Sequence, residues 1–251
     1  MTAAVTDAEL AASLAEQAGR LLLELQTSSG LNGKPLGKRG DADSNELLLR
    51  ELAAARPDDA VLSEESADSP ARLAADRVWI IDPLDGTREY GMDGRSDWAV
   101  HVALWERGAA VPSITAAAVA QPALGAVYAP HPPSLPRPHD GLVFLVSDSR
   151  PPAFAAPVAA QFGATLAPMG SAGAKAMAVL RGDADAYLHA GGQWEWDSAA
   201  PVGVVVAAGL HASRIDGAPL AYNEPHPYLP DLLICRVDLA QPLLKAIAAA
   251  L

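Results

Sequence analysis

The chain has 251 residues, of which 50% are hydrophobic and 19% charged, and its formal net charge at pH 7 is −12. This composition predicts a globular protein with a large core, and it argues against disorder, a membrane protein, and broad binding to nucleic acid or acidic membranes. The N-terminus lacks a basic and apolar leader, so we expect a cytoplasmic protein. The single cysteine, Cys235, excludes an intrachain disulfide and suits a small strand residue.

The first part of the chain predicts two helices. A capping box from Thr6 to Glu9 opens the first, and apolar residues then recur at three- and four-residue intervals. Residues 30–40 contain four glycines and three basic residues, which favours a mobile loop. A second helix is expected over residues 44–55, because leucines fall on one face and Pro57 follows its end.

Short apolar runs predict the strands of the first half. Residues 60–65 and 78–82 have the pattern of buried strands. Residues 98–105, 114–120 and 126–128 have the pattern of antiparallel strands that follow them. We therefore expect two helices packed on a sheet in this half.

A proline-rich segment divides the chain. Residues 129–140 hold five prolines and predict a stiff, exposed connector between an N-terminal α+β half (residues 1–140) and a C-terminal α/β half (residues 141–251). In the second half, strand-like runs alternate with helix-like runs, as is typical of α/β proteins. The expected strands cover residues 142–146, 184–188 and 232–237, and the expected helices cover residues 153–162, 172–180, 198–209 and 239–249.

The run of residues 78–90 is the first candidate site. Four large apolar residues lead into Asp82, Pro83, Asp85 and Gly86, and because proline cannot continue the ladder we expect the strand to end at Asp82. Two carboxylates beside a glycine amide suggest a divalent metal that holds a phosphate. The same pattern also occurs in ordinary surface turns, where Asp and Gly only satisfy turn geometry.

Two further acidic positions bear on this choice. The strand at residues 60–65 also ends in acids, Glu64 and Glu65, and two neighbouring strands that both end in carboxylates repel each other unless a cation lies between them. Asp197 follows Trp196 and precedes small residues. It has the pattern of a helix N-cap, although a helix N-terminus also favours bound anions.

Three of these motifs together resemble a known family. Ser63-Glu64-Glu65, Asp82-Pro83-Leu84-Asp85-Gly86-Thr87 and Trp196-Asp197-Ser198-Ala199-Ala200 occur in the order and approximate spacing of the inositol monophosphatase-like superfamily of metal-dependent, lithium-sensitive phosphatases. The resemblance spans nearly the whole chain. It implies a five-layered α-β-α-β-α sandwich with the site between the two halves, two or three Mg²⁺ ions per site, and inhibition by Li⁺.

The resemblance also implies roles for individual residues. The expected magnesium ligands are the side chains of Glu64, Asp82, Asp85 and Asp197 and the backbone carbonyl of Leu84. Gly86 and Thr87 are expected to hold the phosphate, and Asp41 to pair with Thr87 and orient the attacking water, with Asp43 as the alternative acid. His101 lies in the alternating pattern of an expected strand, and His131 and His139 lie in the connector. We interpret all three histidines as structural.

Three weaker signals concern the substrate. Arg88-Glu89-Tyr90 is similar to the corresponding sequence of the bisphosphate nucleotidase branch, the CysQ-like enzymes. Residues 170–175, with Ser171 and Lys175, resemble the turn and lysine that hold the nucleotide in that branch, although a helix start with a solvated lysine has the same pattern. Residues 146–150, with Ser149 and Arg150, resemble a strand-end loop of those enzymes, with arginine in place of histidine.

These resemblances imply an enzyme that hydrolyses the 3'-phosphate of adenosine 3',5'-bisphosphate (PAP), and of its 5'-phosphosulfate analogue, in sulfate assimilation. The alternatives are a broad inositol or sugar phosphate phosphatase and a non-catalytic nucleotide-binding regulator on the same fold. In each case the partner is a small molecule, with neither nucleic acid nor membrane, and a homodimer is allowed.

Overall fold

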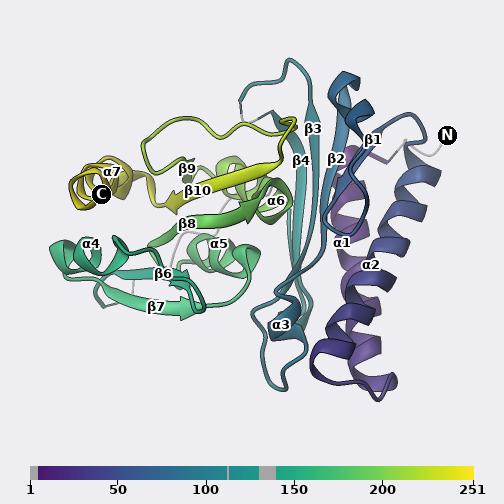
Figure 1. The fold of residues 1–251 in the computed structure, drawn as a ribbon, viewed down its shortest axis with the longest axis horizontal. Coiled ribbons are helices and arrows are strands. Elements are labelled where there is room, and N and C mark those ends of the chain that lie inside the picture. The colour runs from purple at the N-terminus through teal and green to yellow at the C-terminus, as the bar shows by residue number, and fades with distance from the viewer. Residues whose placement is uncertain (1–4, 112, 130–139) are drawn as a thin grey trace.

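The computed structural model describes residues 5–111, 113–129 and 140–251. Over these residues the elements stack in five layers, alternately helices and sheets. Figure 1 shows the first sheet edge-on, between α1 and α2 on one side and the second half of the chain on the other. The expected α-β-α-β-α sandwich is therefore confirmed. Among the described helices, none combines the length and the hydropathy that crossing a bilayer requires.

The first sheet follows the strand order β1-β2-β3-β4-β5 within the described residues. β1 and β2 run parallel, and the other neighbours run antiparallel. Helices α1 and α2 cover its outer face, on the right in Figure 1. The elements are α1 (Asp7–Ser28), α2 (Gly33–Ala55), β1 (Ala60–Ser63), β2 (Arg77–Asp85), α3 (Thr87–Tyr90), β3 (Ala99–Glu106), β4 (Ile114–Gln121) and β5 (Ala126–Tyr128), with 3-10 turns at Pro70–Ala74 and Pro122–Leu124.

The second sheet has the strand order β7-β6-β8-β10-β9 in the part of the chain that is described. β6 is parallel to β7 and β8, and β10 is antiparallel to β8 and β9. Helices α5 and α6 lie between the two sheets, and α4 and α7 cover the far side (Figure 1). The elements are β6 (Val143–Ser147), α4 (Ala155–Phe162), β7 (Thr165–Met169), α5 (Ala172–Arg181), β8 (Ala186–Trp194), α6 (Glu195–Ala207), β9 (His211–Ser213), β10 (Tyr228–Cys235) and α7 (Val237–Ala250).

Strand β2 shows why the apolar run at residues 78–81 is unbroken. Val78 and Ile80 belong to the cluster that includes α5 and α6, whereas Trp79 and Ile81 belong to the cluster with α1 and α2. Successive strand residues face opposite sides of a sheet, so a strand covered by helices on both faces has to be apolar at every position.

Residues 33–40 of the glycine-rich segment are helical, so the expectation of a mobile loop over residues 30–40 is wrong there. Helix α2 begins at Gly33 rather than near residue 44. A Cβ on Gly37 would lie 2.6 Å from Thr87 Cγ2, and one on Gly40 would lie 2.9 Å from a ring carbon of Tyr90. These glycines let α2 approach α3 closely rather than making the chain flexible.

Strand β2 also does not stop at Asp82, as the proline had suggested. It continues to Asp85, which pairs with Ala99, and the register shifts between Asp82 and Asp85. The bulge places Pro83 where the ladder needs no amide donor. The carbonyl of Pro83 instead accepts a hydrogen bond of 2.8 Å from the buried hydroxyl of Ser44 in α2.

The other expected elements are confirmed to within a few residues, except that β8 and β10 are longer than expected, and the short strands β7 and β9 were not expected. Helix α6 begins at Glu195, so Asp197 lies in its first turn and is not its N-cap. Cys235 is a buried strand residue, as expected. Most of the proline-rich segment, with His131 and His139, lies outside the described residues, so the division at residue 140 stays a prediction.

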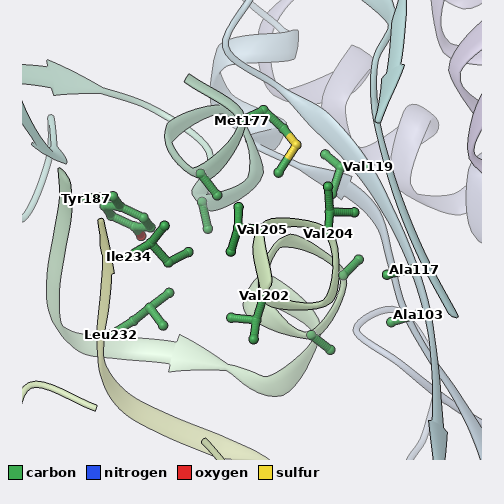
Figure 2. Packing of buried hydrophobic residues seen from close by; sticks show 14 of the residues in the cluster. Ala103, Ala117, Val119, Met177, Tyr187, Val202, Val204, Val205, Leu232 and Ile234 are labelled. Atoms are coloured by element: carbon green, nitrogen blue, oxygen red, sulfur yellow. The ribbon is translucent and has the colours of Figure 1, made fainter. Parts of the chain in front are cut away.

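Helix α6 joins the two sheets. Figure 2 shows Val202, Val204 and Val205 between Ala117 of β4 on one side and β10 on the other. A Cβ on Gly203 would lie 2.6 Å from Ile114 Cγ2 and 2.7 Å from Ala117 Cβ. Glycine at this position therefore lets the helix lie directly on the first sheet.

We predict that Gly203→Val lowers the free energy of unfolding by about 1–3 kcal/mol, because the added carbons overpack the contact between α6 and β4. Urea denaturation measures this change. The control, Ala207→Val, places the same side chain on an exposed position of the same helix and should cost no more than about 0.5 kcal/mol. Equal small losses for both variants would contradict the close contact.

Candidate active site

The acidic site lies at the edge of the first sheet where β1 and β2 end. The two strands are parallel, with Ser63 paired to Ile81, so both leave the sheet at the same edge. Glu64 directly follows β1, and Asp82 directly follows Ile81, the last residue of β2 that pairs with β1. The bulge then brings Asp85 to the same edge.

Three carboxylates from two distant parts of the chain meet at this edge. One oxygen from each of Asp82, Asp85 and Asp197 lies within 4.8 Å of the others. Asp82 and Asp85 are only 1% and 7% exposed. Asp197 comes from the first turn of α6, where its Oδ2 accepts a hydrogen bond of 2.6 Å from the amide of Trp194.

Burial and crowding disfavour the charged forms of several of these acids. Burial, followed by the charge of Asp85, raises the pKa of Asp197 to about 7. Burial and the charge of Glu64 raise the pKa of Asp82 well above its ordinary value. Glu64 is an exposed residue, yet desolvation of its carboxyl group, followed by the charge of Asp85, raises its pKa to about 7. A bound cation would relieve this repulsion.

Asp85 has the opposite shift. Burial alone would raise its pKa, but His101, together with donors from the N-cap and first turn of α5, holds the pKa of Asp85 below its ordinary value. The hydroxyl of Ser171 and the amide of Gly173 donate to Asp85 Oδ2 at 2.5 and 2.7 Å, and His101 Nε2 lies 3.2 Å from the same oxygen. The ring of His101 therefore lies against the acidic cluster, and its interpretation as a structural residue stays a prediction.

The donor atoms suit a hard divalent cation. The cluster of Asp82, Asp85 and Asp197 offers carboxylate oxygen atoms, which Mg²⁺ prefers in octahedral coordination. The contacts of Asp85 among the described residues converge on Oδ2, which leaves Oδ1 as the oxygen available to a cation. The residues present therefore fit the metal that the sequence suggests.

Thr87 contacts the acid that the sequence favours. Its hydroxyl lies 3.2 Å from Asp41 Oδ1 and 3.1 Å from the carbonyl oxygen of Leu84. Burial, followed by the charge of Glu65, raises the pKa of Asp41 to about 7. Asp43 instead forms an ion pair of 2.6 Å with Arg39. The structure thus brings Asp41, and not Asp43, to the threonine.

Gly86 is required by both its conformation and its surroundings. Its φ is +88°, a region that favours glycine. A Cβ there would lie 3.1 Å from the carbonyl oxygen of Asp97 and 3.2 Å from Ser171 Cβ. The turn after β2 therefore packs directly against the start of α5, which comes from the other half of the chain.

A pocket of about 410 Å³ opens beside the acids. This volume is within the range of pockets that bind small molecules. The pocket brings together many of the residues assigned from sequence: Asp85, Thr87, Arg88, Ser149, Arg150, Ser171, Lys175 and Asp197.

The three basic residues of the pocket differ in how they are paired. Arg88 forms ion pairs with Glu89 and Asp148. Lys175 is buried, and its ammonium group donates to the carbonyl oxygens of residues 169, 170 and 171 at 2.6–3.2 Å. The guanidinium of Arg150 has no ion pair or hydrogen bond to another described residue, so it is the cation most available to a ligand.

The structure also adds pocket residues that the sequence analysis did not identify. Tyr187, His189 and Gln193 line the pocket from β8. His189 is 4% exposed, and neither ring nitrogen has a hydrogen-bond partner among the described residues. Burial and the charges of Lys175 and Arg150 lower the pKa of His189 to about 4, so the ring is neutral at pH 7. Because side chains alternate between the two faces of a strand, the odd-numbered positions of these three residues could have indicated from the sequence that they share a face.

A family model described as the inositol monophosphatase family matches residues 3–132 and 138–247. The chain belongs to this family. The family resemblance seen in the three acidic motifs is therefore confirmed.

Among the relatives within this family, the 3'-phosphoadenosine 5'-phosphate phosphatase of Mycobacterium bovis (strain ATCC BAA-935 / AF2122/97) is 55% identical over 243 residues, which cover 93% of this chain and 90% of that protein. The protein of the same name from Mycobacterium leprae (strain TN) is 54% identical over 256 residues, which cover 98% and 94%. The solved structure of inositol monophosphatase-II from Staphylococcus aureus MSSA476 superimposes with a TM-score of 0.77 at 18% identity, covering 94% and 91%. This last likeness bears on the fold alone.

We predict that Mg²⁺ stabilises this family member more at high pH than at low pH. Acids whose folded pKa is raised stabilise the fold below their unfolded pKa of about 4. They lose that contribution as the pH rises through about 7, the folded pKa of Glu64 and Asp197. The increase in melting temperature on adding Mg²⁺ to chelator-treated protein should therefore be larger at about pH 8 than at about pH 5.

Two variants sharpen this measurement. Asp197→Asn removes a charge from the cluster and should reduce the Mg²⁺-induced increase in melting temperature. The control, Asp76→Asn, alters an acid that is 85% exposed and paired with Arg107, and should leave the increase unchanged. Equal increases at both pH values in the wild-type protein would contradict the electrostatic argument.

Proposed function

We propose that this protein is a magnesium-dependent phosphatase that hydrolyses the 3'-phosphate of adenosine 3',5'-bisphosphate to give AMP and phosphate. The observation that supports this substrate best is the identity of 54–55%, over more than nine-tenths of the chain, to proteins named 3'-phosphoadenosine 5'-phosphate phosphatase. The pocket supports the same substrate class, because its cations lie beside an acidic cluster that suits a metal.

A bisphosphate needs two anion positions. The first is the acidic edge, where Gly86 and Thr87 would hold the phosphate that is removed and the acids would hold the metal. The second is the cationic wall of the pocket, where the guanidinium of Arg150, which no other described residue pairs, would bind the 5'-phosphate. The 5'-phosphosulfate analogue carries an anion at the same place, so we include it as a substrate.

Glu64, Asp82, Asp85, Asp197 and the carbonyl of Leu84 would hold the metal. When bound, Mg²⁺ supplies Lewis-acid stabilisation of the phosphate oxygens and a more acidic water. We also propose that two or three ions bind per site and that Li⁺ inhibits, as the family resemblance implies.

Thr87 would orient the attacking water, and Asp41 would accept its proton. A carboxyl group with a pKa of about 7 can accept a proton near neutral pH, which is the useful range for a general base. The hydroxyl of Thr87 lies between Asp41 Oδ1 and the carbonyl oxygen of Leu84, so it can accept from a water while it donates to one of these oxygens. This arrangement holds a nucleophilic water against the phosphate position.

Phosphate release from a substrate panel tests the proposal. The panel holds the bisphosphate, its 5'-phosphosulfate analogue, inositol 1-phosphate and a sugar phosphate, each with Mg²⁺, with chelator and with added Li⁺. We expect the highest kcat/KM for the bisphosphate. A strong preference for inositol phosphate would favour the broad phosphatase, and binding of the bisphosphate without hydrolysis would favour the regulator. The cytoplasmic location and the homodimer also stay proposals, which cell fractionation and sedimentation measure.

We predict that Asp41→Asn lowers kcat by roughly 10²- to 10⁴-fold, the usual contribution of a general base, with a much smaller change in KM. Asp43→Asn is the matched control, because Asp43 lies in the same helix but pairs with Arg39. It should keep kcat within about twofold of wild type. Comparable losses in both variants would remove Asp41 from its proposed role.

We predict that Arg150→Ala raises the KM for adenosine 3',5'-bisphosphate by roughly 10- to 100-fold, because a charge-assisted hydrogen bond is lost. The KM for adenosine 3'-monophosphate, which lacks the second phosphate, should change less than about threefold. Arg20→Ala, on the outer helix α1, is the control and should affect neither substrate. Equal effects of Arg150→Ala on both substrates would place Arg150 away from the 5'-phosphate.

A further inference from the structure

We propose that His101 is a positioning residue that aligns Asp85 and Asp197 for metal binding, and so sets the affinity of the metal site on which the proposed function rests. The ring is fully buried in β3, directly opposite Asp82 in the ladder with β2. Its Nδ1 lies 3.0 Å from the carbonyl oxygen of Trp196, and its Nε2 lies 3.2 Å from Asp85 Oδ2. One side chain thus contacts both halves of the site.

The contact with Trp196 acts on Asp197 through the backbone. The carbonyl of Trp196 belongs to the planar peptide unit that contains the Cα of Asp197. Holding that carbonyl therefore fixes the orientation of the peptide plane from which the Asp197 side chain extends. A second hydrogen bond, from the amide of Trp194 to Asp197 Oδ2, fixes the carboxylate itself. Together they hold the first turn of α6 against the first sheet.

The contact with Asp85 acts on the carboxylate directly. Nε2 is within ion-pair distance of Oδ2, although it is not aligned as a hydrogen bond. Ser171 and Gly173 donate to the same oxygen. These contacts orient the carboxyl group so that Oδ1 is left for the cation. Removing a group that contacts a metal ligand, but not the metal, typically lowers metal affinity or activity by about 10- to 100-fold.

The packing around the ring leaves it little freedom. A Cβ on Gly173 would lie 2.1 Å from Nε2 and 3.1 Å from two ring carbons. Helix α5 therefore closes over the imidazole, and glycine at residue 173 is what makes room for it. A ring held this tightly can transmit its position to both acids.

Two amide substitutions separate the two contacts. In His101→Asn the amide nitrogen falls near the position of Nδ1, so the contact with Trp196 can be kept while the contact with Asp85 is lost. In His101→Gln the amide nitrogen falls near Nε2, so the contact with Asp85 can be kept while the contact with Trp196 is lost. His101→Leu removes both contacts but still fills the site.

The test measures Mn²⁺ binding to the full chain without substrate, from the electron paramagnetic resonance signal of the free ion. We expect the Kd for Mn²⁺ to rise at least about 10-fold in His101→Asn and in His101→Gln, and towards 100-fold in His101→Leu. At saturating Mg²⁺ the KM for the bisphosphate should stay within about twofold of wild type, since the ring does not line the pocket. His211→Gln, which alters a half-buried histidine of β9, is the control and should bind Mn²⁺ as wild type does.

A Kd within about twofold of wild type in both amide variants would overturn the proposal, whether or not His101→Leu folds. If the variants are folded by circular dichroism and bind Mn²⁺ normally but show a raised KM, the ring acts on the substrate instead, and the proposal is also wrong. Failure of the wild-type protein to bind Mn²⁺ would instead contradict the metal site itself, and with it the proposed function. The two kinds of failure are therefore distinguishable.

Discussion

The repulsion between carboxylates at one buried edge is the constraint on which the rest of the structure depends. Asp82 and Asp85 are nearly inaccessible and share this edge with Asp197. Burying like charges this close is costly unless a cation or a proton neutralises them. The fold therefore holds its acids in an arrangement that a cation stabilises, and the raised pKa values of Asp82 and Asp197 are the signature of that arrangement.

Small residues allow several elements to meet at this edge. Gly37 and Gly40 let α2 approach α3, Gly86 lets the turn after β2 approach the start of α5, and Gly173 makes room for His101. At each of these positions a side chain would occupy space that another element fills. The approach of α2 is also what carries Asp41 to the hydroxyl of Thr87. The glycines that allow these elements to pack closely therefore also bring the candidate site residues together.

The sequence predicted those parts of the site that follow from local rules. The apolar run before Asp82 implied burial on both faces, and two neighbouring strands that both end in acids implied carboxylates brought close together. The prediction of a loop at residues 30–40 was wrong because glycine is found both in flexible segments and where two elements pack closely. Which of the two applies depends on the elements that surround the glycine in the fold. Strand β2 passed Pro83 because a bulge removed the need for an amide donor.

His101 could not be recognised for a related reason. Its alternation within an apolar strand is the pattern of any core residue, and its meaning depends on the register that places it opposite Asp82. Register and contacts between the two halves of the chain are tertiary properties that no local pattern carries. For His189 and Gln193 the alternation of the strand could indicate a shared face, but that this face lines the pocket depends on β8 ending beside the acidic edge.

The distribution of charge explains how an acidic protein can bind a polyanion. The net charge of −12 repels such a ligand at long range, so local cations have to compensate. Two of these cations are already engaged: Arg88 is held by Glu89 and Asp148, and Lys175 is held by backbone carbonyls.

A guanidinium that is already paired contributes a field but has fewer free donors, so Arg150, which has no ion pair within the described part of the chain, is better suited to direct recognition. In the proposed function the acidic edge would determine the reaction class, and a few side chains of the second half that face it would determine the choice of substrate.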